Sequence, residues 1–139
     1  MKVDVVRNIL EANEAVAAEL NASFTDRGIL ALNLMSSPGS GKTTLLERTL
    51  TDLKGEFSMA VIEGDCQTEN DARRVAATGA RAVQINTAGG CPLDSSMVRD
   101  AVEKLGVDGV DILVVENVGN LVCPAEFSVG EDYKVTILS

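Results

Sequence analysis

Apolar and polar positions follow one another along the chain in blocks that predict strands and helices in turn. Short, nearly continuous apolar runs are typical of strands buried on both faces, and they occupy 29–35, 58–62, 82–85, 110–115 and 135–138. Helical spacing predicts helices over 43–53, over 70–77, and from a cap at Asp94 or Ser95 to Leu105. The alternation predicts an α/β fold, a mainly parallel sheet with helices on both faces.

A further amphipathic helix is predicted at the amino end, from Asp4 to Leu20 and extending to about residue 22. Its acidic residues lie opposite a stripe with helical spacing. The stripe consists of Val6, Ile9, Leu10, Asn13, Val16, Ala17 and Leu20. We interpret this segment as a packing helix, with a partner-binding helix as the alternative. We expect residues 1–139 to form a single domain.

One stretch carries a recognisable binding motif. Residues 36–44 read Ser-Ser-Pro-Gly-Ser-Gly-Lys-Thr-Thr and lie between the first strand and the helix after it, which is the context of a phosphate-binding P-loop. Glycines let backbone N–H groups surround phosphate oxygens, and the helix N-terminus adds partial positive charge. Ser36 stands where the pattern has its first glycine, and a tight turn that binds nothing is the alternative.

The P-loop motif predicts roles for its side chains. We expect Lys42 to reach the β- and γ-phosphates and the Thr43 hydroxyl to bind Mg²⁺. The predicted nucleotide-binding residues are Pro38, Gly39, Ser40, Gly41, Lys42, Thr43 and Thr44.

Carboxylates follow two of the predicted strands. Asp65 and Glu116 come after buried runs, and ligands of parallel sheets bind beyond the carboxyl ends of the strands. A carboxylate beside a P-loop can hold Mg²⁺ or orient the attacking water. We therefore predict Asp65 and Glu116 as Mg²⁺ and catalytic residues, together with Lys42. The alternative is that these carboxylates cap the helices that follow, above all in the case of Asp65. Glu63 is a further carboxylate in the loop after the second predicted strand.

Two cysteines, Cys91 and Cys123, each precede a proline in a loop at the same predicted edge. Thiolates bind Zn²⁺ and Ni²⁺. Two ligands make a poor site, but two copies related by a twofold axis would supply four thiolates. On residue type alone we favour the alternative, in which both are small buried apolar side chains. Cys66 has no partner by sequence.

Composition narrows the classes of function. The 139 residues carry a net charge of −9, which argues against general binding of nucleic acid or anionic membranes. No apolar run reaches membrane-spanning length and no signal peptide is visible, so we expect a cytoplasmic protein. The sequence has no histidine, which removes the commonest general base. We therefore expect any hydrolysis to be slow.

Several strings resemble the hydrogenase nickel-incorporation GTPases, the HypB family. They are residues 32–47, 61–65, 67–68, 70–72, 89–91 and 116–125. The last string, Glu-Asn-Val-Gly-Asn-Leu-Val-Cys-Pro-Ala, is highly specific, whereas a P-loop alone is not. The resemblance covers nearly the whole chain.

The resemblance implies a G-domain-like P-loop GTPase of the SIMIBI class that binds GTP and Mg²⁺. It implies a homodimer that depends on nucleotide or metal, and nickel delivery to [NiFe]-hydrogenase. Other maturation proteins and the hydrogenase large subunit would be partners. Residues matching Lys42, Thr43, Asp65 and Glu116 belong to the nucleotide and magnesium site. Residues matching Cys91 and Cys123 bind Zn²⁺ or Ni²⁺ at the dimer interface.

Two departures from the family pattern affect these expectations. The family normally has Cys-His where this chain has Cys91-Pro92, so we expect weaker or altered metal binding. The family's guanine-reading Asn-Lys-x-Asp motif has no match, so GTP preference rests on the resemblance and we expect a fragment or shortened domain. Two alternatives stay open: a GTPase of another nickel-insertion pathway such as urease maturation, and a non-catalytic metal-binding or scaffolding module.

Overall fold

The computed structural model describes residues 2–37, 41–64, 69–86, 93–117 and 127–138. In chain order its elements are α1 (Lys2–Asp26), β1 (Leu30–Ser36), α2 (Lys42–Leu53), β2 (Met59–Glu63), α3 (Glu69–Ala76), β3 (Arg81–Gln84), α4 (Ser95–Leu105), β4 (Ile112–Glu116) and β5 (Tyr133–Ile137). The predicted alternation of strands and helices is confirmed. Most boundaries lie within one or two residues of the prediction.

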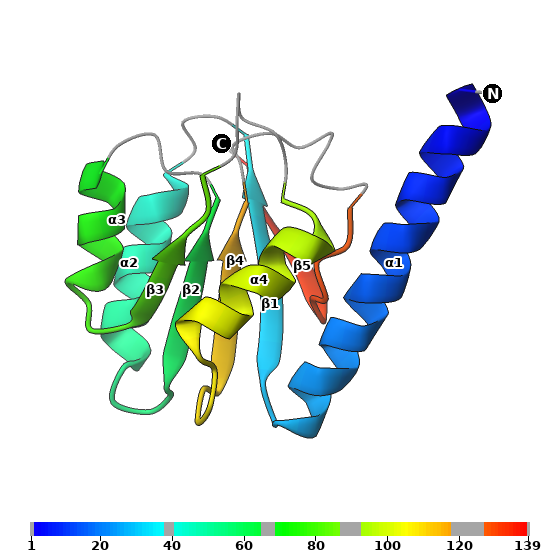
Figure 1. Cartoon of the computed structure of the whole chain (residues 1–139). Helices are drawn as coiled ribbons and strands as arrows, with labels where there is room; N and C mark the ends of the chain where they lie inside the picture. The colour runs from blue at the N-terminus through cyan, green and yellow to red at the C-terminus, as the bar shows by residue number, and fades with distance from the viewer. Residues whose placement is uncertain (1, 38–40, 65–68, 87–92, 118–126, 139) are drawn as a thin grey trace.

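The strands form one parallel sheet in the order β3-β2-β4-β1-β5. Because all strands run the same way, their carboxyl ends meet at one edge, shown at the top of Figure 1. The register places Glu116 of β4 between Leu34 of β1 and Glu63 of β2. The end of the P-loop strand and two carboxylates therefore lie side by side at this edge.

Helices cover both faces of the sheet, as predicted. Helices α1 and α4 pack against each other on one face, and α2 and α3 pack together on the other (Figure 1). Each face has its own apolar cluster. The first is built around Phe24, Leu93 and Leu113, and the second around Leu46 and Leu50. The sheet is thus the middle of three layers, as expected for parallel strands.

Helix α1 extends further than predicted, to Asp26. Phe24 is 1% exposed and lies four residues after Leu20, so the buried stripe continues for another turn. The predicted stripe is wrong at its beginning, because Ile9 is 54% exposed. Figure 1 shows the first turns of α1 projecting beyond the sheet, where no layer covers them. The middle and carboxyl end of α1 therefore supply its packing.

A buried amide fixes α1 to the rest of the fold. The Asn13 side-chain oxygen accepts a hydrogen bond from the Ser95 backbone N–H at 2.8 Å, and its NH₂ group donates to the Ser128 carbonyl at 2.8 Å. The Ser95 hydroxyl also donates to Asn13 Oδ1 at 2.7 Å. Asp94, not Ser95, caps α4, by accepting from the Met97 N–H. Ser95 is instead the first helical residue and binds α1.

Strand β5 pairs with β1 and is the most exposed strand of the sheet. Its residues 133–136 are exposed, with Tyr133 at 65%. Across the described ranges, no helix combines the length and apolar character that crossing a membrane requires.

Candidate functional site

The first turn of α2 has the backbone geometry that a phosphate site needs. Gly41 is its N-cap, with φ of +84°, a left-handed conformation that glycine adopts without strain. No acidic residue lies in the first turn. The first N–H groups of a helix lack partners within it and carry partial positive charge. The amino end of α2 therefore suits an anion.

Lys42, the predicted phosphate-binding lysine, lies at the carboxyl edge of the sheet. It is 5% exposed, and its Nζ donates a hydrogen bond to the backbone carbonyl oxygen of Asn117 at 2.6 Å. A buried ammonium group needs such acceptors, because losing water without replacement costs several kcal/mol. Lys42 thus links the start of α2 to the residue that follows β4.

The structure brings two of the predicted magnesium residues together. The Thr43 hydroxyl donates to Oε1 of Glu116 at 3.0 Å, and Glu116 is 1% exposed. Glu63, also 1% exposed, is the register partner of Glu116. Hydroxyl and carboxylate oxygens are the hard donors that Mg²⁺ takes in proteins. The residues at this edge therefore fit a magnesium ion.

Sequence reasoning gave Glu63 too little emphasis. Glu63 and Glu116 each end a strand whose other residues are apolar and, except for the half-buried Ile112, buried. A glutamate that closes an apolar strand is the signal that marks both positions. Their pairing could not be read from the sequence, because β2 and β4 are not consecutive strands.

Asn117 is a buried junction that sequence reasoning did not single out. Its side-chain oxygen accepts from the Leu93 N–H at 3.2 Å, and its NH₂ group donates to Oδ1 of Asn33 at 3.2 Å. Its own N–H donates to the Leu34 carbonyl at 3.0 Å. The Asn33 amide in turn donates to Glu131 at 3.1 Å. Asn117 therefore connects the end of β4 to β1 and to Leu93, which lies just before α4.

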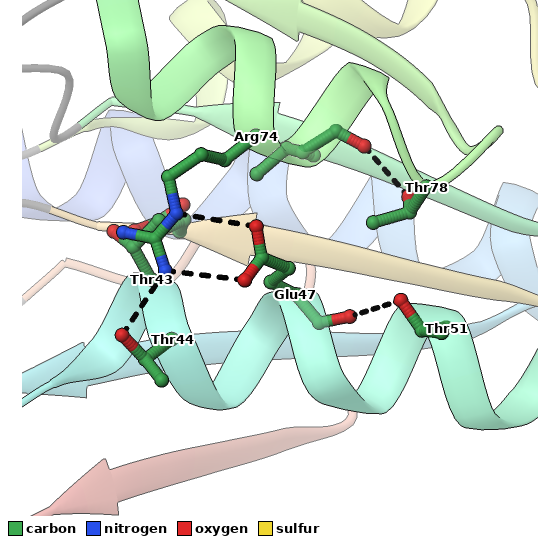
Figure 2. Close-up of polar contacts among 8 residues, drawn as sticks. Thr43, Thr44, Glu47, Thr51, Arg74 and Thr78 are labelled. Carbon is green, nitrogen blue, oxygen red and sulfur yellow. Dashed lines mark hydrogen bonds and ion pairs between the residues drawn. The ribbon is translucent and has the colours of Figure 1, made fainter.

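A second polar cluster joins α3 to the first turns of α2 (Figure 2). Arg74 donates from Nε and Nη2 to the two carboxylate oxygens of Glu47, each at 3.2 Å, and from Nη2 to the Thr44 hydroxyl oxygen at 3.1 Å. The hydrogen bonds and charge of Arg74 lower the pKa of Glu47 from its ordinary value, against a smaller opposing effect of burial. Arg74 and Glu47 are 27 residues apart, and no sequence pattern indicated their contact.

Eight residues discussed individually from the sequence lie outside the described residues. They are Pro38, Gly39, Ser40, Asp65, Cys66, Cys91, Pro92 and Cys123. Their roles stay predictions. Within the described ranges, no group of three or more cysteine, aspartate or glutamate side chains is gathered as a metal site would require.

The fold and this arrangement place the chain in a recognisable class. A parallel sheet with a Gly-Lys-Thr helix start at its carboxyl edge, and a strand-end carboxylate bonded to the threonine, defines the P-loop nucleotide-binding proteins. Residues 30–138 match the family described as CobW/HypB/UreG, nucleotide-binding domain. The chain belongs to this family.

Known proteins support this placement. The chain is 56% identical over 137 residues to the hydrogenase maturation factor HypB of Rhizobium leguminosarum bv. viciae, which covers 99% of this chain and 46% of that protein. It spans about half the length of the curated relatives it matches.

Two solved structures are also similar. The hydrogenase maturation factor HypB from Archaeoglobus fulgidus gives a TM-score of 0.83 at 35% identity, covering 91% of this chain and 62% of that one. HypB from Helicobacter pylori in complex with nickel gives a TM-score of 0.78 at 43% identity, covering 90% of this chain and 59% of that one. These similarities confirm the predicted family resemblance and fold class.

Proposed function

We propose that this chain binds GTP with Mg²⁺ and hydrolyses GTP slowly, as a cytoplasmic component of nickel delivery during [NiFe]-hydrogenase maturation. The observation that carries the proposal is the buried Lys42 ammonium group at the start of α2, next to the Thr43–Glu116 hydrogen bond. Nickel is supported by similarity to a hydrogenase maturation factor and to a HypB structure solved in complex with nickel. The guanine base rests on the family resemblance alone.

Lys42 would bind the β- and γ-phosphates. Its ammonium group has three N–H donors, and one is directed at the neutral Asn117 carbonyl at 2.6 Å. A phosphate oxygen is the stronger acceptor, because charge-assisted hydrogen bonds are roughly twice as strong as neutral ones. When a nucleotide binds, Lys42 would therefore either donate to a phosphate oxygen as well as to Asn117, or exchange the hydrogen bond to Asn117 for one to phosphate.

Thr43 and Glu116 would hold the magnesium ion, with Asp65 as the predicted third oxygen ligand or water-orienting residue. Bound Mg²⁺ supplies positive charge that stabilises the phosphate oxygens. Because the sequence contains no histidine, proton transfer from water would rely on carboxylates. Glu116 is 1% exposed, which keeps its carboxylate fixed.

Asn117 would connect the proposed nucleotide site to the proposed metal site. Its carbonyl accepts from Lys42, and its side chain accepts from Leu93. Leu93 follows the sequence that contains Cys91, and Asn117 precedes the sequence that contains Cys123. A change in the hydrogen bond between Lys42 and Asn117 would therefore act on a residue that is connected to the segment containing Cys91 and to the segment containing Cys123. We propose that nucleotide state sets metal affinity and dimerisation through this residue, and linkage requires the converse effect as well.

The first test is isothermal titration of the chain with GTP, GDP, ATP and ADP in the presence of Mg²⁺. We expect preferential binding of the guanine nucleotides. Lys42→Ala should abolish triphosphate binding and hydrolysis, whereas Lys54→Ala, an exposed lysine beyond the other end of the same helix, should leave both unchanged. Absence of binding, or equal binding of both bases, would contradict the proposal and favour a non-catalytic metal-binding module.

A further inference from the structure

We propose that Arg74 is a positioning residue for the nucleotide phosphates, because it orients the Thr44 hydroxyl group. Arg74 lies on α3, outside the P-loop motif, and donates to the Thr44 hydroxyl oxygen at 3.1 Å (Figure 2). The inference rests on the proposed binding of nucleotide. It adds to that proposal a residue that controls how the first turn of α2 meets the phosphate nearest the nucleoside.

The chemistry of a hydroxyl group sets the direction of its proton. A threonine hydroxyl has one donor hydrogen and two acceptor lone pairs, whereas a guanidinium group only donates. The Thr44 oxygen must therefore accept from Arg74, and its own proton points elsewhere. A phosphate oxygen, which only accepts, is the matching partner. Arg74 thus prepares Thr44 to donate to phosphate before the nucleotide arrives.

Other threonines of α2 use their protons differently. The hydroxyl groups of Thr49 and Thr51 donate to the carbonyl oxygens four residues earlier, at 2.9 and 2.8 Å, as is common within helices. Figure 2 shows this bond for Thr51. Thr44 is the third residue of α2, and its hydroxyl oxygen accepts from Arg74 of α3. Thr44 is therefore placed to use its proton on a ligand.

The ion pair with Glu47 holds the guanidinium in place for this task. Both carboxylate oxygens of Glu47 accept from Arg74, each at 3.2 Å, and the two side chains are 37% and 33% exposed. Thr44 and Glu47 are three residues apart on α2 and so lie on one face of the helix. The planar fork of arginine can bond both at once, which a lysine ammonium cannot reproduce.

The position of Thr44 indicates which phosphate it addresses. The preceding residue, Thr43, is the predicted magnesium ligand. We assign the Thr44 hydroxyl to the α-phosphate, one of the two phosphates that a P-loop cradles and that diphosphates and triphosphates share. Loss of the Arg74 contact should therefore weaken GDP and GTP binding by the same factor.

The experiment is a double-mutant cycle read by titration calorimetry with Mg·GDP and Mg·GTP. We expect Arg74→Ala to weaken both nucleotides about fivefold, and Thr44→Val at least as much, the loss of one net hydrogen bond. The double variant should bind as Thr44→Val does, because Arg74 acts through that hydroxyl. Thr44→Ser, which keeps the hydroxyl, should bind both nucleotides more tightly than Thr44→Val does.

Two further variants, Arg48→Ala and Arg74→Lys, test whether Arg74 acts by orienting the Thr44 hydroxyl or only by its positive charge. Thr44→Val guards against a loss of binding that is caused by misfolding. Arg48→Ala removes an arginine of α2 that forms an exposed ion pair with Asp52 at 2.9 Å, and it should leave affinity unchanged. Arg74→Lys keeps the charge but loses the fork, and should bind as weakly as Arg74→Ala. Thr44→Val alters an exposed side chain, so it tests the same contact even where Arg74→Ala fails to fold.

Three results would overturn the inference alone. They are unchanged affinity in Arg74→Ala, losses that add in the double variant, and full recovery by Arg74→Lys, which would mean that charge and not orientation matters. Failure of the unmodified chain to bind any nucleotide would instead overturn the proposed function and this inference with it. The two failures are therefore distinguishable.

Discussion

The ammonium nitrogen of Lys42 lies 2.6 Å from the backbone carbonyl oxygen of Asn117, while the Asn117 side chain accepts from the Leu93 N–H at 3.2 Å. One buried residue therefore forms hydrogen bonds both with the predicted phosphate-binding lysine and with the backbone of Leu93, just before α4. Packed, hydrogen-bonded groups of this kind transmit changes because they have few alternative arrangements. The contact makes coupling between the nucleotide and the thiols testable at a single side chain.

Asn117→Ala keeps the carbonyl that accepts from Lys42 but removes the hydrogen bonds to Leu93 and Asn33. We expect a loss of about 1–3 kcal/mol in the free energy of unfolding, from buried polar groups left without partners. GDP affinity should change little. The difference in Ni²⁺ affinity between the GDP-bound and nucleotide-free forms should disappear, as measured by competition with a chromogenic chelator. A difference as large as that of the unmodified chain would contradict coupling through this residue.

Glu116→Gln should weaken the magnesium dependence of nucleotide binding. The amide retains an oxygen that can accept from the Thr43 hydroxyl, but it loses the negative charge that Mg²⁺ prefers. We expect GTP hydrolysis to fall by at least about tenfold, the effect of roughly 1.4 kcal/mol. Phosphate release assays over a range of Mg²⁺ concentrations measure both effects. Glu103→Gln, at an exposed position of α4, is the matched control, and an equal loss there would refute the assignment.

Asn13→Ala should destabilise the fold without acting on the site. It leaves the Ser95 N–H, the Ser95 hydroxyl and the Ser128 carbonyl without the Asn13 side chain. We expect a loss of roughly 2–4 kcal/mol in the free energy of unfolding, measured by urea denaturation followed by circular dichroism. Asn8→Ala, at an exposed position of the same helix, should stay within about 0.5 kcal/mol of the unmodified chain. Equal stability of the two variants would show that α1 is not held by Asn13.

The Arg74–Glu47 ion pair gives stability a defined pH dependence. Arg74 lowers the pKa of Glu47 below its ordinary value of 4.5, so the folded state favours the ionised carboxylate. This contribution is present above the unfolded pKa and is lost as pH falls through the lower, folded pKa. The stability advantage of the unmodified chain over Glu47→Gln should therefore shrink on acidification below about pH 4.5. Thermal unfolding of both proteins measures it, and a constant difference over this range would contradict the ion pair.

Metal binding at the predicted thiols should respond to Pro92. Replacing Pro92 by histidine would place beside Cys91 the nitrogen ligand that the family resemblance implies, and imidazole suits both Zn²⁺ and Ni²⁺. We expect Pro92→His to tighten Ni²⁺ binding, and Cys91→Ser or Cys123→Ser to weaken it. Cys66→Ser is the control, with no expected effect. Equal Ni²⁺ affinity in all four variants would mean that Cys91 and Cys123 are not ligands.

The sequence was informative where structure is local. Apolar runs predicted every strand, and the order strand, glycine-rich turn, Gly-Lys-Thr predicted the start of α2, because these signals reside in adjacent residues. The end of α1 was missed because a helix boundary depends on what packs against Phe24. The predicted outline of the fold was therefore better than its boundaries.

Long-range contacts were beyond sequence reasoning. The pairing of Glu63 with Glu116 depends on strand order, and the contact of Arg74 with Glu47 joins helices that no periodicity relates. The helical spacing places Asn13 in the same stripe as its apolar neighbours, yet its amide binds Ser95 and Ser128. Such partners are set by the folded arrangement, and one sequence carries no record of them.

The strand order also determines when the phosphate loop is completed during synthesis. Strand β1 pairs with β4 and β5, which follow β2 and β3 in the sequence, whereas β2 and β3 are consecutive and pair directly. Pairing across long sequence separations is slow, and chains emerge from the ribosome amino end first. Within the described sheet, β1 therefore gains its partner strands only after β4 has been synthesised. The proposed nucleotide site would then be completed after β2 and β3 have been made, and a bound nucleotide would not act as a template for the first stages of folding.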